Sequence, residues 1–148
     1  MLLLSIAVVL IVVGCFVSLR PLPSTAKIVD ADTLMVHGRK WRLNGFDAPE
    51  WDQPGGQEAS RELRRILSGR GVYMTFRGEI DPYNRPLVTI FTMRGPLAWR
   101  MALAGHAHGE GRIGRELTRV ARFARRGLWS HPGTVVSPST WREMHPRT

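Results

Sequence analysis

The sequence predicts a mixed α+β chain, mainly β, that begins with an apolar helix. Three observations carry this prediction. Short β-branched or apolar runs recur between turn residues, apolar residues at helical spacing occupy longer stretches, and residues 2–19 carry no charge. A hydrophobic content of 43% favours a folded core over disorder, and 148 residues suffice for one globular domain of ordinary size.

The apolar N-terminal segment, Leu2–Leu19, is about long enough to span a bilayer. We expect a transmembrane or signal-anchor helix over residues 1–20 and a stiff, proline-containing linker over residues 21–25, with a long signal peptide as the alternative. The stretch Val12–Cys15 also resembles a bacterial lipobox, which leaves lipidation of Cys15 open. Cys15 is the single cysteine, so the chain cannot form an intramolecular disulfide.

Five strands are expected in a domain that covers residues 26–130. His37-Gly38-Arg39 is typical of a hairpin turn between the second and third strands. In the third strand Trp41 and Leu43 alternate with Arg42, so a core-facing Trp41 and Leu43 would turn Arg42 toward the opposite face, where a ligand could meet it. The five expected strands are Ala26–Val29, Thr33–His37, Lys40–Phe46, Val72–Phe76 and Leu87–Phe91.

About three helices are expected beside these strands. The first starts near Ala59 and stops at Gly69, and a short one covers Pro96–Leu103. The predicted buried stripe of the last helix consists of Ile113, Leu117, Val120, Ala121 and Ala124. Five short strands curled on themselves, with these helices, predict an OB-type barrel. Residues 131–148, with little periodicity, are expected to form a loosely ordered tail.

The charge balance indicates a polyanionic partner. The formal net charge is +9, and all but two of the 21 basic residues are arginine. Arginine offers a planar fork of donors that matches phosphate oxygens, so nucleic acid or an anionic membrane surface is the expected partner. General solubility, or a genome rich in arginine codons, is the alternative explanation.

Against this basic background, four acids crowd into the segment Val29–Glu50. Asp30 and Asp32 lie two residues apart on an extended chain and point the same way, so their repulsion must be offset. Asp47 and Glu50 flank Pro49 in a loop that ends a strand. Carboxylates from two loops, with carbonyls nearby, suit a hard divalent cation, whereas no Cys or His pattern favours zinc. Solvated acids at turns are the alternative.

These residues belong to a longer ordered pattern. Asp30-Ala31-Asp32-Thr33, Arg42-Leu43, Asp47-Ala48-Pro49-Glu50, Asp81-Pro82-Tyr83-Asn84-Arg85 and Gly127-Leu128-Trp129 follow one another along the chain. In order and spacing they resemble the staphylococcal nuclease family. The resemblance implies an OB-fold barrel with three helices and calcium-dependent hydrolysis of phosphodiester bonds in DNA and RNA.

The same resemblance implies roles for individual residues. Asp32 and Asp47 would be carboxylate ligands of Ca²⁺, the backbone carbonyl of Ala48 would be a third ligand, and Asp30 would act through water. Glu50 would serve as base for the attacking water, or at least orient it. Arg42 and Arg85 would clamp the scissile phosphate, and Tyr83 would lie against the nucleotide.

Some positions depart from the family pattern or lie beyond it. Asn84 replaces a glycine before Arg85, and asparagine tolerates the left-handed conformation that this turn needs. His106 and His108 are interpreted as loop or surface residues. Arg115, Arg119 and Arg122 on the last helix are expected either to attract substrate phosphates or to form a solvated face.

Two functions remain open on the sequence. One is an active nuclease of low sequence specificity, and the other is an OB-fold module that holds nucleic acid at a membrane without cutting it. We expect a monomer. The basic residues after the apolar segment favour a cytoplasmic domain, but the hazard of a non-specific nuclease and the scarcity of cytoplasmic calcium favour an extracytoplasmic one, tethered to the membrane, secreted or lipidated.

Overall fold

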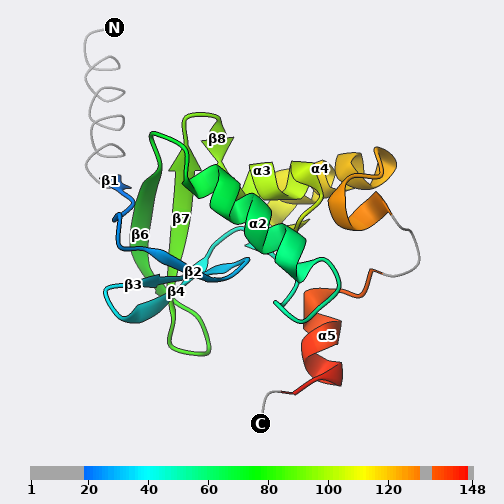
Figure 1. The fold of residues 1–148 in the computed structure, drawn as a ribbon, viewed down its shortest axis with the longest axis horizontal. Helices are drawn as coiled ribbons and strands as arrows, with labels where there is room; N and C mark the ends of the chain where they lie inside the picture. Colours follow the sequence, from blue (N-terminus) through cyan, green and yellow to red (C-terminus); the bar gives the residue numbers. More distant parts are fainter. Residues whose placement is uncertain (1–18, 131–134, 147–148) are drawn as a thin grey trace, which may run out of the picture.

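The computed structural model describes residues 19–130 and 135–146, which form a curled sheet with helices packed along one side (Figure 1). The predicted N-terminal helix and Cys15 lie outside these residues. No helix of the described part is both long and apolar enough to cross a membrane.

The sheet is built on five longer strands, as predicted. The second and third of them form a hairpin around His37 and Gly38, whose positive φ angles of 48° and 77° fit a tight two-residue turn. Four short strands, absent from the prediction, extend the pattern: β1 and β8 join the main sheet, and β5 pairs with β9. The strands are β1 (Arg20–Pro21), β2 (Lys27–Asp30), β3 (Thr33–Val36), β4 (Arg39–Leu43), β5 (Phe46–Asp47), β6 (Tyr73–Ile80), β7 (Pro86–Thr92), β8 (Gly95–Pro96) and β9 (His108–Gly109).

The strand order makes the sheet OB-like. The main path runs β1-β6-β7-β4-β3-β2, and all neighbours are antiparallel except β4 and β7, which run parallel with Arg42 opposite Leu87. The five longer strands therefore lie side by side in the order β2-β3-β4-β7-β6, which is first, second, third, fifth and fourth along the chain. This mixed, strongly curled sheet, covered on one side by helices, is consistent with the predicted OB-type barrel, in the form of a half-barrel.

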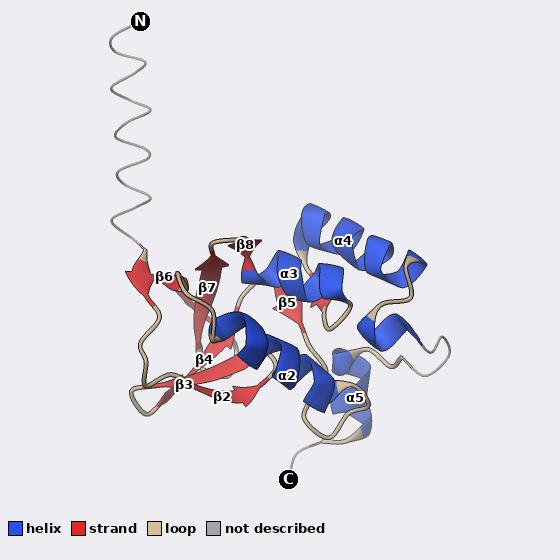
Figure 2. Cartoon of the chain, turned by 45° about the horizontal axis from the view of Figure 1, so that its top comes forward, coloured by secondary structure: helices blue, strands red, loops and turns tan. Residues whose placement is uncertain are grey.

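Two helices, α2 (Gly56–Leu67) and α3 (Leu97–Ala104), cover the apolar side of the sheet (Figure 2). A third helix, α4 (Gly111–Phe123), packs on α3 and β9 and leads to a short 3₁₀ turn at Gly127–Ser130, and α5 (Pro138–Met144) lies apart from the sheet. Leu63 of α2 and Leu97 and Met101 of α3 are fully buried against Leu34 and Leu43 of the sheet. Burial of these large side chains holds the strands in register and so places the polar residues at the strand ends.

Two expectations about the helices are wrong. Ile113 and Val120, predicted to be buried, are 51% and 49% exposed. Ala124 is exposed as well, whereas Ala121 is buried as predicted. The face of α4 that packs consists of Ala121 together with Gly114 and Thr118, which lie at helical spacing and are small. The tail is not loosely ordered throughout, because α5 is a capped helix: Ser137 accepts a hydrogen bond from the Thr140 backbone N–H at 3.2 Å.

Candidate active site

Arg42 joins two of the predicted metal ligands. Thr33 lies opposite Arg42 in the β3–β4 ladder, which sets Asp32 beside the guanidinium. Nη1 of Arg42 donates a hydrogen bond to the Asp32 carboxylate, and Nη2 donates to Oδ1 of Asp47 at 3.0 Å. One guanidinium thus spans carboxylates from two strand ends and offsets their mutual repulsion.

Burial makes this pairing necessary. Asp32 is only 6% exposed, and a buried carboxylate is costly unless it is paired and hydrogen-bonded. Burial would lower the pKa of Arg42, but the attraction of Asp32 and the hydrogen bond to Asp47 outweigh it, so that this pKa is raised. As predicted, Leu43 faces the core while Arg42 turns toward the polar site.

Arg85 is positioned by a tight loop. Asp81 accepts hydrogen bonds from the backbone N–H groups of Tyr83 and Arg85, at 2.9 and 2.8 Å, and from Nε of Arg85 at 2.7 Å. Asn84 adopts the expected left-handed conformation, with φ of 60°. Burial opposes the charge on Asp81, but these hydrogen bonds prevail and lower its pKa. The role of Asp81 in fixing Arg85 was not anticipated from the sequence.

Arg42 contacts Asp32 directly, and Arg85 is linked to Asp32 through Thr33. Nη1 of Arg85 donates to the Thr33 hydroxyl at 3.3 Å, and that hydroxyl donates to Oδ1 of Asp32 at 2.8 Å. Tyr83 is 77% exposed, and its ring centroid lies 5.5 Å from the Arg85 guanidinium carbon. An exposed ring beside a phosphate-binding candidate is available to a nucleotide, and its predicted role stays a prediction.

Glu50 is held by the turn that leads into α2. The Gln53 side chain accepts a hydrogen bond from the Glu50 backbone N–H at 3.2 Å, and the Gln53 N–H donates to the Glu50 carbonyl at 3.0 Å. A Cβ on Gly56 would lie 1.8 Å from the Glu50 carbonyl oxygen, so only glycine fits there. This turn fixes the backbone of Glu50.

A third arginine, Arg142 of α5, reaches the same acids. Its Nη1 lies 2.9 Å from Oε1 of Glu50, and its Nη2 lies 3.2 Å from Oδ2 of Asp47. Burial would lower the pKa of Arg142, but its hydrogen bonds to Glu50 and Asp47 raise it well above its usual value. The sequence reasoning missed Arg142, although Ser137 followed by Pro138 is a helix-start signal that could have revealed α5.

The remaining predicted site residues are placed as follows. Asp30 lies opposite Thr33 in the β2–β3 pairing, next to a register shift, and Ala48 is fully buried after β5. The candidate substrate-binding arginines of α4 are exposed and outside this hydrogen-bonded cluster: Arg119 pairs with Glu116 at 2.6 Å, and Arg122 lies over the Trp129 ring at 4.2 Å. Arg115 is exposed on the same helix.

His106 lies in the loop between α3 and β9, in line with its interpretation as a loop or surface residue, whereas His108 is part of β9; both side chains are half-buried. His108 lies opposite Asp47 in the β5–β9 pairing and packs edge-on against Trp129, at 5.1 Å between ring centroids. Burial lowers the pKa of both imidazoles, and the charge of Arg122 lowers that of His108 further. Both histidines are therefore favoured in their neutral forms.

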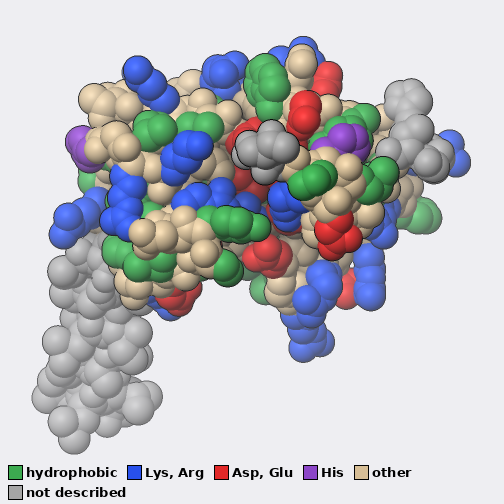
Figure 3. Space-filling model, turned by 90° about the horizontal axis from the view of Figure 1, so that it is seen from below, with side chains coloured by type: hydrophobic (Ala, Val, Ile, Leu, Met, Phe, Trp, Pro, Cys, Tyr) green, Lys and Arg blue, Asp and Glu red, His purple; other side chains and the backbone are tan. Residues whose placement is uncertain are grey.

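The donor set limits which cation could bind. Within residues 19–130 and 135–146, no three Asp, Glu, His or Cys side chains converge as a ready-made cage. Acidic and basic side chains are interleaved on the face seen in Figure 3. A cation here would depend on two carboxylates completed by carbonyl oxygen and water, which suits a hard ion.

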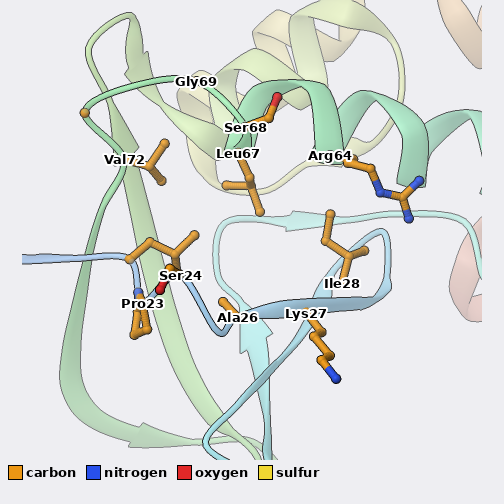
Figure 4. A pocket seen from close by; sticks show the side chains of 12 residues that line it. Pro23, Ser24, Ala26, Lys27, Ile28, Arg64, Leu67, Ser68, Gly69 and Val72 are labelled. Carbon is orange, nitrogen blue, oxygen red and sulfur yellow. The ribbon is translucent and has the colours of Figure 1, made fainter.

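A separate hollow lies between the linker before β2 and the end of α2 (Figure 4). Its walls include Ile28, Leu67 and Val72, and Lys27 and Arg64 stand at its edge. Among the described residues, its lining contains no acid and none of the predicted site residues. The acid–arginine cluster is therefore the candidate active site.

The fold and the site together define a class: an OB-like domain whose strand ends carry carboxylates interleaved with arginines. No family model matches the chain. It is 32% identical over 150 residues to a probable endonuclease LCL3 of Debaryomyces hansenii, covering 87% of this chain and 61% of that protein. It is 31% identical over 123 residues to the probable staphylococcal-like nuclease CAN2 of Oryza sativa subsp. japonica, covering 78% of this chain and 33% of that protein.

A second rice protein, the probable staphylococcal-like nuclease CAN3, is 30% identical over 123 residues. The chain spans less than two thirds of the length of these relatives. It belongs to the staphylococcal-nuclease-like family, as the sequence motifs indicated.

Proposed function

We propose that this chain is a calcium-dependent nuclease that hydrolyses phosphodiester bonds of DNA, RNA or both with low sequence specificity. One observation carries the proposal. An unbroken series of hydrogen bonds runs from Arg85 through Thr33, Asp32 and Arg42 to Asp47, and so gathers three distant stretches of sequence into one site. The nuclease names of the relatives support the same conclusion.

The residues present fit Ca²⁺ as the cofactor. Asp32 and Asp47 would hold the ion with the Ala48 carbonyl, and Asp30 would contribute through water. Two carboxylates that one guanidinium already bridges lie close enough to share an ion, and all these donors are the hard oxygen atoms that Ca²⁺ prefers. When bound, Ca²⁺ would stabilise negative charge on the phosphate and make water more acidic.

The chain's own residues would supply the rest of the chemistry. Arg42 and Arg85 would donate hydrogen bonds to the phosphate oxygens, on which negative charge increases in the transition state. Both guanidinium groups are held by carboxylates before substrate arrives, so little reorganisation is needed. Glu50 would accept the proton of the attacking water, and the turn with Gln53 holds its backbone in place.

The setting of this activity is also a proposal. The apolar segment would tether a monomeric domain to a membrane, with the domain outside the cytoplasm, where calcium is plentiful. The exposed arginines of α4, Arg115, Arg119 and Arg122, would attract substrate phosphates.

Digestion of DNA and RNA with calcium, magnesium or a chelator tests the activity. We expect cutting with calcium, little with magnesium, which demands stricter octahedral geometry, and none with chelator. Asp47→Ala should abolish cutting and sharply weaken calcium binding in calorimetry. An unchanged binding isotherm for Asp47→Ala would remove Asp47 from the metal site.

Glu50→Gln separates chemistry from binding. The substitution keeps the size of the side chain, and loss of a positioned base should lower the single-turnover rate by about 100- to 10,000-fold. Nucleic-acid binding should persist. A wild-type rate in Glu50→Gln, together with chelator-resistant binding of uncut substrate, would favour a module that only holds nucleic acid.

A further inference from the structure

Arg142 contacts the two carboxylates on which the proposed reaction depends. It pairs with Glu50, the candidate base, at 2.9 Å and with Asp47, the candidate ligand, at 3.2 Å. The Arg142 side chain is 38% exposed, whereas those of Glu50 and Asp47 are 13% and 19% exposed. The guanidinium is therefore the more exposed partner of both acids, and a cation that bound these acids would compete with it.

The helix that carries Arg142 is docked on the turn that carries Glu50. Nε2 of Gln53 donates a hydrogen bond to the Val136 carbonyl at 2.7 Å, and Gln53 itself is 5% exposed. Pro138, at the first position of α5, is buried. These contacts give α5 a defined position beside the site, apart from the other helices (Figure 1).

Arg42 and Arg142 differ in how they are attached. Arg42 comes from β4, inside the sheet, and its backbone is fixed by the β3–β4 and β4–β7 pairings. Arg142 comes from a seven-residue helix, and a helix of that length has little stability of its own. Its ion pairs are partly exposed, and such pairs are individually weak. Of the two, Arg142 is the one that can be released at small cost.

We propose that α5 is an intramolecular cover, in which the Arg142 guanidinium holds the Asp47 and Glu50 carboxylates until a divalent cation displaces it. The inference rests on the proposed function, because it assumes that these carboxylates serve a cation and an attacking water. While Arg142 is in place, it neutralises both acids and blocks their solvent side. Calcium competes for the same oxygen atoms, so binding of the ion and release of α5 are coupled.

A different role would be a third arginine that binds substrate phosphate. Within the described part of the chain, the side-chain hydrogen bonds of Arg142 go to carboxylate oxygens of Asp47 and Glu50, which favours the cover. The two roles predict different effects when the guanidinium is removed. Removal of a cover should raise calcium affinity, whereas removal of a phosphate-binding arginine should lower turnover at saturating calcium.

Calcium titration by calorimetry tests the cover on the full chain without substrate. We expect Arg142→Ala to bind calcium about 10-fold tighter than wild type, which corresponds to about 1.4 kcal/mol. Arg142→Lys, which keeps the charge but loses the planar fork, should lie between them. Arg112→Ala removes the same charge from an exposed position on α4 and should match wild type.

Hydrogen exchange read by mass spectrometry gives a second measurement. In wild type, the backbone amides of α5 should exchange slowly without calcium and faster with it. In Arg142→Ala they should exchange fast in both conditions, and turnover at saturating calcium should equal that of wild type.

Each other outcome overturns the inference in a recognisable way. Equal calcium affinity in wild type and Arg142→Ala, or α5 exchange that calcium does not change, removes the cover and leaves the proposed function intact. Lower turnover of Arg142→Ala at saturating calcium assigns Arg142 to phosphate binding instead. If neither protein binds calcium, the proposed calcium dependence fails together with the cover.

Discussion

Arg85 owes its position to a single carboxylate. Asp81 accepts hydrogen bonds from both the backbone and the side chain of Arg85, so the loop and the guanidinium are fixed together. A donor that is already oriented loses less conformational entropy when substrate binds. At the residue scale, the function of the site thus depends on acids that hold arginines as much as on acids that would hold an ion.

Substitution of Arg85 tests whether its planar shape matters. Lysine keeps the charge but cannot donate to Asp81 and to phosphate through one rigid fork. We expect Arg85→Lys to lose about 100-fold or more in single-turnover rate, nearly as much as Arg85→Ala, because a donor aimed at developing charge is removed. Substrate affinity should fall only modestly. A wild-type-like rate in Arg85→Lys would show that charge alone suffices.

At the scale of elements, α4 shows how small residues decide which face packs. Gly114 lies against Gly109 of β9, and a Cβ on Gly114 would come within 2.8 Å of the Gly109 carbonyl carbon. Ile113 and Val120, which dominate the apolar pattern, remain half-exposed because the small face allows the closer approach. The helix is thereby held near β9, whose partner β5 carries Asp47.

Gly114→Ala is therefore expected to destabilise the protein. In an exposed helix this change should add about 1 kcal/mol of stability, but overlap with a packed backbone typically costs about 1–3 kcal/mol. Denaturant unfolding should show a lower midpoint for Gly114→Ala and almost no change for Ile113→Ala, the exposed control. A stabilised Gly114→Ala would mean that α4 does not pack closely on β9.

The outer face of α4 provides a second prediction at this scale. A variant that neutralises Arg115, Arg119 and Arg122 together should bind nucleic acid more weakly and with a flatter salt dependence. Each arginine that no longer neutralises a phosphate reduces the slope of log affinity against log salt by about 0.9. Neutralising the exposed arginines of α2, Arg61, Arg64 and Arg65, is the matched control. Equal slopes for wild type and the α4 variant would identify that face as solvated surface.

At the scale of the whole molecule, half-buried histidines make stability depend on pH. Burial lowers the pKa of His106, and the charge of Arg65 lowers it further. The charges of Glu62 and Glu58 raise it, but the net shift is downward from an ordinary value near 6.5. The unfolded chain therefore takes up a proton at higher pH than the folded chain does. This contribution to stability is complete above pH 6.5 and is lost as the pH falls through the lower, folded-state pKa.

Denaturant unfolding between pH 8 and pH 5 measures this effect. We expect the free energy of unfolding to decrease as the pH falls below about 6.5, the ordinary pKa of histidine. His106→Asn should show a smaller decrease, because it removes one of the groups that titrate. An identical pH dependence in both proteins would mean that His106 does not contribute.

The elements that the sequence determined are those with a strong local signal. Three such features depend on residues within a few positions of one another, and the structure has each of them. They are the alternation of Trp41, Arg42 and Leu43, the turn at His37-Gly38 and the left-handed conformation of Asn84. The ordered motifs around Asp32, Asp47 and Arg85 also came from sequence, and the fold brings them together. Their chemical roles remain predictions.

Only the tertiary structure decided which surfaces meet. The apolar pattern of α4 pointed to Ile113 and Val120, but the distance at which two backbones can pack favoured Gly114. Arg142 lies 95 positions after Asp47, and no local pattern links them. A contact of that kind depends on where the whole chain folds, because charge attraction acts between neighbours in space, whereas periodicity and turn chemistry act between neighbours in sequence.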